Sequence, residues 1–260
     1  MTDDAVRYST RGSSSWLTID RPDRRNALSP DVVEGLLAGL ARAATDADAR
    51  VVVLTGAGDR TFSAGGDLGS MAPAGGRVDE HDRRGRIGSV LRALIGHPKP
   101  VIARVNGHAL AGGFGLALAC DLIVAAEAAE FGTPEVDVGL WPFMITTVIQ
   151  RNVPRKLALE MMLTGRRVRA DEAARWGLVN RVVAADELDA TVDALAEDLA
   201  SKSPLVLRLG KESFRRAQDM AFDDALDYLQ AMLTVELQSE DVVEGVSAFV
   251  EKRAPNWKGR

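Results

Sequence analysis

The stretch HALAGGFGLALACD, residues 108–121, largely decides how this chain folds and points to its chemistry. Three glycines, Gly112, Gly113 and Gly115, stand where the first turn of a helix is expected, directly before a small apolar run. Each glycine lowers the stability of a helix by about 1 kcal/mol relative to alanine, so a cluster of three indicates a structural or functional requirement for glycine. Bare backbone lets a neighbouring strand pack closely, and it equally lets a ligand oxygen approach the unpaired N–H groups of a helix N-terminus.

A second turn of small residues occurs earlier, in TFSAGGDLGSM, residues 61–71, after an apolar strand. Two separated turns, each aiming one N–H inward, are what a two-donor oxyanion hole requires. Neither turn has the G-x-G-x-x-G spacing of a dinucleotide site, so a nicotinamide cofactor is not expected. The single cysteine, Cys120, lies in the apolar run and is expected to be a buried core residue.

The surrounding pattern is that of an α/β protein. Strands are predicted at residues 13–21, 50–58, 99–107 and 121–127. A helix begins after Ser29 as N-cap, with Pro30 in its first turn. Residues 72–86 combine Gly, Pro and dense charge, which predicts a surface loop leading into a helix near 87–95. From Thr146 onward the apolar spacing is helical.

Length and composition bound the function. The chain has 260 residues, of which 46% are hydrophobic and 27% charged, with a formal net charge of -5. This mild acidity gives no electrostatic reason to expect nucleic acid as a partner. No apolar stretch is long enough to span a membrane and no signal peptide is recognisable, so we expect a cytoplasmic protein. An α/β core over residues 1–200 and a helical region over 201–260 are predicted.

Six segments together resemble the crotonase, or enoyl-CoA hydratase/isomerase, family. They are RPDRRNALS, FSAGGDL, NGHALAGGFGLALACDLIVAAE, FGTPEVDVGL, PRKLALEMMLTGRRVRADEAARWGLVNRVV and FVEKRAPNW, which occur in order over about residues 14–257. The resemblance implies a spiral of β-β-α turns with a helical C-terminal trimerisation region, and homotrimers that often pair into hexamers. It also implies a coenzyme A thioester as substrate, with no separately bound cofactor and no metal.

The resemblance assigns roles to individual residues. The backbone N–H groups of Ala64 and Gly112 would bind the thioester carbonyl, and Glu135 would be the acid/base. Five further residues are expected to line the substrate site: Gly65, Asp67, Gly113, Gly115 and Trp141. Arg24 would meet the coenzyme A phosphates, and Lys252 the adenine end from a neighbouring subunit. For Asp67, structural hydrogen bonds within its own turn are the alternative reading; His108, Asp121 and Asp137 are read as structural.

One departure from the family pattern bears on the reaction. Two-glutamate hydratases carry their second glutamate at the position that is Gly115 here, so Glu135 would act alone. A single carboxylate suits the family's 3-enoyl to 2-enoyl-CoA isomerases, and this is the function we favour. The alternatives are a 2-enoyl-CoA hydratase of fatty-acid β-oxidation and, from another class, a non-catalytic acyl-CoA-binding or RNA-binding relative.

Overall fold

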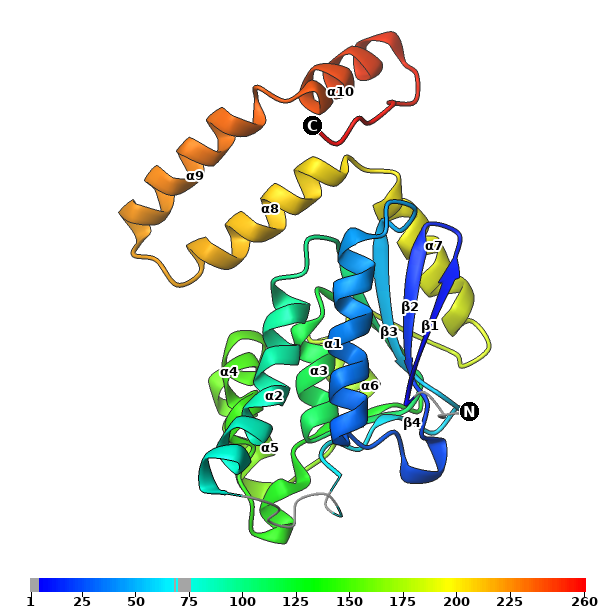
Figure 1. Ribbon diagram of the computed structural model, residues 1–260, viewed down its shortest axis with the longest axis vertical. Helices are drawn as coiled ribbons and strands as arrows, with labels where there is room; N and C mark the ends of the chain where they lie inside the picture. The colour runs from blue at the N-terminus through cyan, green and yellow to red at the C-terminus, as the bar shows by residue number, and fades with distance from the viewer. Residues whose placement is uncertain (1–4, 68, 70–75) are drawn as a thin grey trace.

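The computed structural model describes residues 5–67, 69 and 76–260, and its strands form two sheets (Figure 1). The larger sheet has the order β1-β2-β3-β5-β7-β10, and the smaller the order β4-β6-β8-β9. The strands of the larger sheet are β1 (Val6–Arg11), β2 (Ser14–Ile19), β3 (Val51–Gly56), β5 (Val101–Val105), β7 (Leu122–Ala126) and β10 (Arg181–Val183). Those of the smaller are β4 (Thr61–Ser63), β6 (His108–Leu110), β8 (Glu130–Gly132) and β9 (Val168–Arg169).

The chain alternates between the sheets, which produces the spiral. Strands β3, β5 and β7 run parallel in the larger sheet, and each is followed in the chain by a strand of the smaller sheet: β4, β6 and β8. The first two of these pairs lead into helices, α2 (Arg77–Ile95) and α3 (Gly112–Ala119). The third leads into the 3₁₀ turn η3 (Pro134–Val138) and then α4 (Phe143–Asn152). The predicted α/β spiral of β-β-α turns is confirmed.

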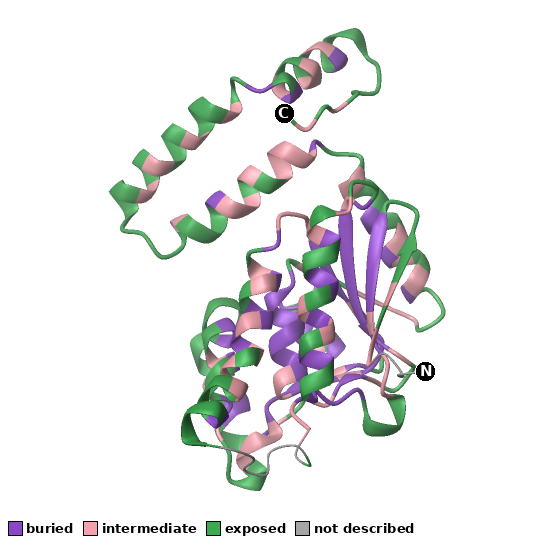
Figure 2. Ribbon diagram, in the orientation of Figure 1, coloured by how far each residue is buried: buried purple, intermediate pink, exposed green. Residues whose placement is uncertain are grey.

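The larger sheet is buried on both faces, as its β-branched runs predict. Val52 and Leu54 of β3 face the main core, where α1 (Pro30–Thr45), α2 and α3 also pack. Val51 and Val53 belong to a second cluster, with α7 (Leu188–Ala200). Figure 2 shows β2 and β3 coloured as buried along most of their length. The helix α1 begins as predicted, because the Ser29 hydroxyl accepts a hydrogen bond from the Val32 N–H at 3.4 Å.

One predicted boundary is wrong. The helix expected near 87–95 begins ten residues earlier, at Arg77, so most of the predicted 72–86 loop is helical. The segment tolerates this because most of its charged side chains face solvent, and the Asp79 carboxylate accepts a hydrogen bond from the Gly76 N–H at 3.1 Å. Residues 72–75 of that predicted loop lie outside the described residues.

The C-terminal helices extend away from this body (Figure 1). They are α8 (Pro204–Ala217), α9 (Phe222–Glu236) and α10 (Glu240–Glu251), and α8 packs against α9 as an antiparallel pair. Large apolar side chains on all three are exposed, among them Phe214, Leu233 and Phe249, with 76%, 53% and 85% exposure. Across the described residues, each helix is too short or too polar to cross a lipid bilayer.

A buried carboxylate ties the start of α8 to α10 and the C-terminus. Asp241 accepts hydrogen bonds from the Ser203 hydroxyl at 2.5 Å and from the Lys258 and Gly259 N–H groups at 2.6 and 3.0 Å. Burial by itself raises the pKa of Asp241, but these hydrogen bonds outweigh burial and lower the pKa below 3.8. The ionised form therefore stabilises the folded tail.

Asp241→Asn is expected to lower the stability of the tail by about 1–3 kcal/mol. The amide NH₂ group of asparagine cannot accept the hydrogen bonds that the Ser203 hydroxyl and the two backbone N–H groups donate to the carboxylate. Proteolysis rates under native conditions would report the local opening. The effect is largest above pH 4 and shrinks as the pH falls through the lowered pKa, where wild-type Asp241 also becomes protonated. Asp223→Asn, in the exposed first turn of α9, is the matched control. Equal proteolysis of the two variants would contradict the assignment.

Candidate active site

The opening stretch forms a strand, a strained residue and then a helix. Ala111 lies between β6 and α3, where its N–H donates to the Gly132 carbonyl at 2.9 Å. Its φ of 51° and ψ of -129° are unfavourable for alanine, so packing must hold it there. Gly112 is the first residue of α3, and its N–H therefore has no partner inside the helix.

The second small-residue turn lies directly beside this helix N-terminus. Leu28 and Gly66 form a parallel bridge, in which the Leu28 N–H donates to Gly65 and the Asp67 N–H to Leu28, at 2.8 and 3.4 Å. In this bridge Leu28 bonds to the residues before and after Gly66, so the N–H of Gly66 itself points away from Leu28 and stays free of it. The Gly66 nitrogen lies 3.7 Å from where a Cβ on Gly112 would be.

The expected donor Ala64 requires a correction. Its N–H already donates to the Arg25 carbonyl at 3.0 Å, so it has no proton to offer a ligand. The same turn supplies a replacement two residues later, because neither Gly66 nor Gly112 donates its N–H to any acceptor recorded among the described residues. A sequence signal existed in the SAGGD segment, but it could not separate Ala64 from Gly66.

Two glycines hold the turns together by packing. A Cβ on Gly65 would lie 2.4 Å from the Ala111 Cβ and 2.8 Å from the Gly112 nitrogen, and Gly65 has a φ of 89°. A Cβ on Gly113 would lie 2.3 Å from the Ser63 carbonyl oxygen. Gly65 and Gly113 thus let α3 approach β4 and the turn that follows it, so these two glycines serve close packing. Gly112 is the glycine of the cluster whose N–H remains available to a ligand oxygen.

Glu135 emerges at the same edge of the smaller sheet as Gly112. Strands β6 and β8 pair in parallel, with Leu110 opposite Gly132, and η3 follows β8 directly. The carboxyl oxygen Oε2 of Glu135 is buried and has no hydrogen-bond partner. Burial raises the pKa of Glu135, and a hydrogen bond from its own backbone opposes this in part. A buried carboxyl group with an unused oxygen and a raised pKa is typical of a catalytic base.

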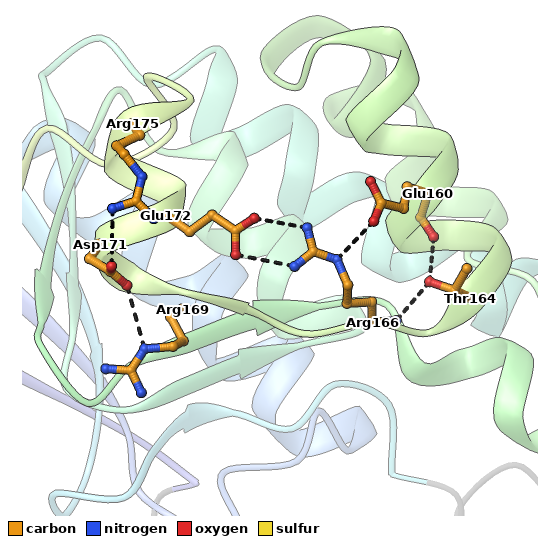
Figure 3. Close-up of polar contacts among 7 residues, drawn as sticks. All are labelled: Glu160, Thr164, Arg166, Arg169, Asp171, Glu172 and Arg175. Atoms are coloured by element: carbon orange, nitrogen blue, oxygen red, sulfur yellow. Dashed lines mark hydrogen bonds and ion pairs between the residues drawn. The ribbon is translucent and has the colours of Figure 1, made fainter.

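The η3 turn that carries Glu135 packs against α5, and a cluster of ion pairs follows the end of that helix. A Cβ on Gly165 would lie 2.9 Å from the Asp137 carboxylate, which places Asp137 against the end of α5 (Arg155–Thr164). The next residue, Arg166, binds Glu172 through two hydrogen bonds of 2.8 and 3.1 Å, and its Nε lies 3.1 Å from Glu160 (Figure 3). The Asp137 carboxylate thus lies beside Gly165 on the surface of η3, and its structural role stays a prediction.

The helix α4 closes the space beside Gly115. A Cβ on Gly115 would lie 2.1 Å from Cγ2 of Ile145 and 2.7 Å from its Cβ, and Ile145 is 3% exposed. In the same helix, the methyl group of Met144 lies 2.9 Å from where a Cβ on Gly88 of α2 would be. Sequence reasoning missed Ile145, because the contact joins residues thirty positions apart.

The other residues expected to bind substrate differ in how close they lie to the two small-residue turns. Arg24 ends the turn η1 (Pro22–Arg24), is exposed and adjoins Arg25, whose carbonyl binds the 64–67 turn. Trp141 is partly buried against the main core. Asp67 forms an ion pair with Arg21 at 3.1 Å and accepts the Gly69 N–H at 3.1 Å, so it stabilises its own turn. Lys252 directly follows α10, and that helix lies at the opposite end of the molecule from β4 (Figure 1).

Three other polar residues of the opening stretch are structural. Asp121 accepts the Val101 N–H at 2.7 Å and lies 2.6 Å from Lys211 of α8. The His108 ring lies 3.5 Å from the Glu130 carboxylate at the start of β8. Cys120 is buried, and burial raises the pKa of its thiol, which removes it as a nucleophile.

Together these residues form a site for acyl chemistry. Two neighbouring N–H groups at a helix N-terminus can stabilise a developing oxyanion, and a carboxylate with an unused oxygen can take or give a proton nearby. No group of three metal-ligating side chains occurs within residues 5–67, 69 and 76–260.

Comparison with known proteins agrees with this geometry. The model of the enoyl-CoA hydratase/isomerase family matches residues 11–260. Carnitinyl-CoA dehydratases of Proteus mirabilis and Escherichia coli are 37% and 38% identical, over 98% and 99% of this chain and 99% of theirs. The crystal structure of an enoyl-CoA hydratase from Bacillus anthracis has a TM-score of 0.93 at 32% identity, covering 98% of this chain and 100% of that one. The corresponding Mycobacterium smegmatis structure gives 0.92 at 35% identity, covering 97% and 98%. The chain therefore belongs to the enoyl-CoA hydratase/isomerase family of acyl-CoA enzymes.

Proposed function

We propose that this enzyme isomerises a 3-enoyl-CoA to a 2-enoyl-CoA by moving one proton. The observation that carries the proposal is the Glu135 carboxyl group, whose buried Oε2 has no partner, together with the apolar Ile145 that fills the space beside Gly115. One carboxylate suffices to remove a proton at one carbon and return it at another, whereas addition of water gains from a second polar group that positions the water.

The residues take the following roles in the proposal. The thioester carbonyl oxygen lies between the N–H groups of Gly66 and Gly112, with Gly66 replacing Ala64. Glu135 removes the proton at C2, the electron pair moves into the enolate and its conjugated double bond, and the same proton returns at C4. One oxyanion-hole donor is worth about 2.7–4 kcal/mol, so two make the weakly acidic C2 proton accessible to a carboxylate.

The coenzyme A part of the substrate is proposed to cross η1, where Arg24 would bind its phosphates. No separate cofactor is needed, because the thioester itself stabilises the enolate. Lys252 is too distant in its own chain to contribute, so a neighbouring subunit would have to supply it. The exposed apolar faces of α8, α9 and α10, with a groove of about 540 Å³ between α8 and α9, support a homotrimer or hexamer. Light scattering would test this, since a mass equal to one chain would exclude it.

A second candidate is addition or elimination of water at a 2-enoyl-CoA. The names of the Proteus mirabilis and Escherichia coli relatives favour it, because both are dehydratases. The third reading, a non-catalytic acyl-CoA-binding or RNA-binding relative, has less support. Both oxyanion turns and an unpartnered Glu135 are present, and the net charge of -5 opposes RNA binding.

Two parallel assays on the purified protein test the proposal. One follows conversion of 3-hexenoyl-CoA to 2-hexenoyl-CoA, and the other follows hydration of crotonyl-CoA, both by the conjugated enoyl absorbance. We expect kcat/KM for isomerisation to exceed that for hydration. Faster hydration would establish the second candidate instead, and activity in neither assay would reject both.

A further inference from the structure

A side chain longer than that of Gly115 would enter a volume beside the proposed oxyanion hole. The helix α4 occupies this volume. Gly115 follows Gly112 by three residues in α3, so a side chain at 115 would lie on the same helix face as position 112, about one turn further along the helix. The three heavy atoms nearest to that position all belong to Ile145, and its Cγ2 lies 2.1 Å from where a Cβ on Gly115 would be. An apolar group thus lies next to the site where the substrate carbon reacts.

We propose that Ile145 determines reaction specificity by excluding water from this volume. The inference rests on the proposed isomerase function and adds a residue to it. Proton transfer within an enolate needs no water, whereas hydration requires one held near the reacting carbon. By filling the volume, Ile145 keeps the Glu135 carboxyl group for the substrate proton.

The polar groups of α4 support this reading. A bound water needs room and two to four polar partners. The hydroxyls of the two residues that follow Ile145 bond back into their own helix: Thr146 donates to the Pro142 carbonyl at 2.8 Å, and Thr147 to the Met144 carbonyl at 3.0 Å. With Ile145 in place, this wall therefore leaves a water neither room nor a side-chain partner; once the volume is opened, the unused Oε2 of Glu135 is the acceptor that a water would use.

The position of Ile145 is fixed at both ends of the helix. Near the start of α4, the Phe143 and Thr146 N–H groups donate to the Trp141 and Pro142 carbonyls at 2.8 and 3.0 Å. At its end, the Asn152 amide donates to the Leu118 carbonyl of α3 at 3.4 Å. The contact of Asn152 with α3 and the burial of Ile145, which is 3% exposed, hold its branch against Gly115.

The test compares Ile145→Ala with Ile145→Val in the full-length protein. Alanine removes Cγ2 and opens the volume, whereas valine keeps Cβ and both γ-carbons and so keeps the contact with Gly115. The readout is the ratio of hydration to isomerisation within one preparation, which does not depend on the fraction of folded protein. We expect alanine to raise the ratio about tenfold or more, and valine to leave it within about twofold of wild type.

A double variant extends the test if Ile145→Ala folds poorly. Gly115→Glu alone is expected to misfold, because of the contact with Ile145. Alanine at 145 would still leave a Cβ 2.7 Å from the new side chain, so the matching change is Ile145→Gly, which leaves only the Cα at 3.8 Å. The pair Gly115→Glu/Ile145→Gly is expected to hydrate crotonyl-CoA faster than wild type.

The outcomes separate the two proposals. A wild-type enzyme that isomerises, with an unchanged ratio in Ile145→Ala and in the double variant, overturns the role of Ile145 and leaves the isomerase function standing. A wild-type enzyme that hydrates faster than it isomerises overturns both, because water would then already have access. A raised ratio in alanine and not in valine supports the inference.

Discussion

Glu135→Gln is expected to lower kcat by about 10²- to 10⁴-fold, the range for loss of a general acid/base. Glutamine has nearly the same shape as glutamate but cannot accept the substrate proton. Because Oε2 has no partner in the protein, the change breaks no hydrogen bond there, and acyl-CoA affinity should stay within a few-fold. Steady-state kinetics with 3-hexenoyl-CoA and titration with a non-reactive acyl-CoA would measure the two quantities separately.

Asp137→Asn is the matched control for Glu135→Gln. It changes another carboxylate of the same η3 turn, one that is exposed and lies against Gly165. We expect its kcat to remain within about threefold of wild type. A comparable loss in both variants would show that the turn, and not the Glu135 carboxyl group, is what activity requires.

The pH dependence of Glu135 gives a second readout on the same residue. Burial raises its pKa above 4.5, so the base form is lost as the pH falls through this raised value, and kcat/KM falls with it. Ionised Glu135 supports activity but has the opposite effect on the stability of the fold. A carboxyl group with a raised pKa destabilises the fold when ionised, so Glu135→Gln is expected to be more stable than wild type at pH 7, with no gain below pH 4.5.

Gly65→Ala is expected to lower kcat by about 10²- to 10³-fold, as for the loss of one oxyanion-hole donor. The added Cβ would lie 2.4 Å from the Ala111 Cβ and 2.8 Å from the Gly112 nitrogen. Both contacts involve groups attached to the backbone, so the 64–67 turn must move away from Gly112, and the Gly66 N–H with it. Isomerisation kinetics would show the loss mainly in kcat.

Gly177→Ala controls for the backbone strain of the Gly65 change. Gly177 has a φ of 77°, close to the 89° of Gly65, but a Cβ there would meet no heavy atom within 4 Å. Both variants are expected to lose roughly 1–2 kcal/mol of stability from the left-handed conformation, and only Gly65→Ala should lose activity. Normal activity in a folded Gly65→Ala protein would contradict the two-donor site.

Sequence by itself determined the local features of this protein. The β-branched run of β3 and the Ser29 cap of α1 depend on neighbouring residues in the chain, so their patterns predict them directly. The helical spacing after Thr146 predicts α5 to α10, but not the short strands β9 and β10 that lie between those helices. The glycine cluster at 112–115 likewise marks a helix that begins with exposed N–H groups. Glu135 was assigned by the family resemblance, and its burial with a partnerless oxygen is consistent with that assignment.

Tertiary structure decided which backbone groups and which spaces remain available. Ala64 and Gly66 look equivalent in sequence, but the Arg25 carbonyl, almost forty residues earlier, takes the Ala64 N–H and leaves that of Gly66. Gly115 reads as an empty position until Ile145, thirty residues later, is seen to fill it. A hydrogen bond or a packed volume used by a distant segment leaves no mark in the local pattern, because availability is a property of the assembled neighbours and not of the residue alone.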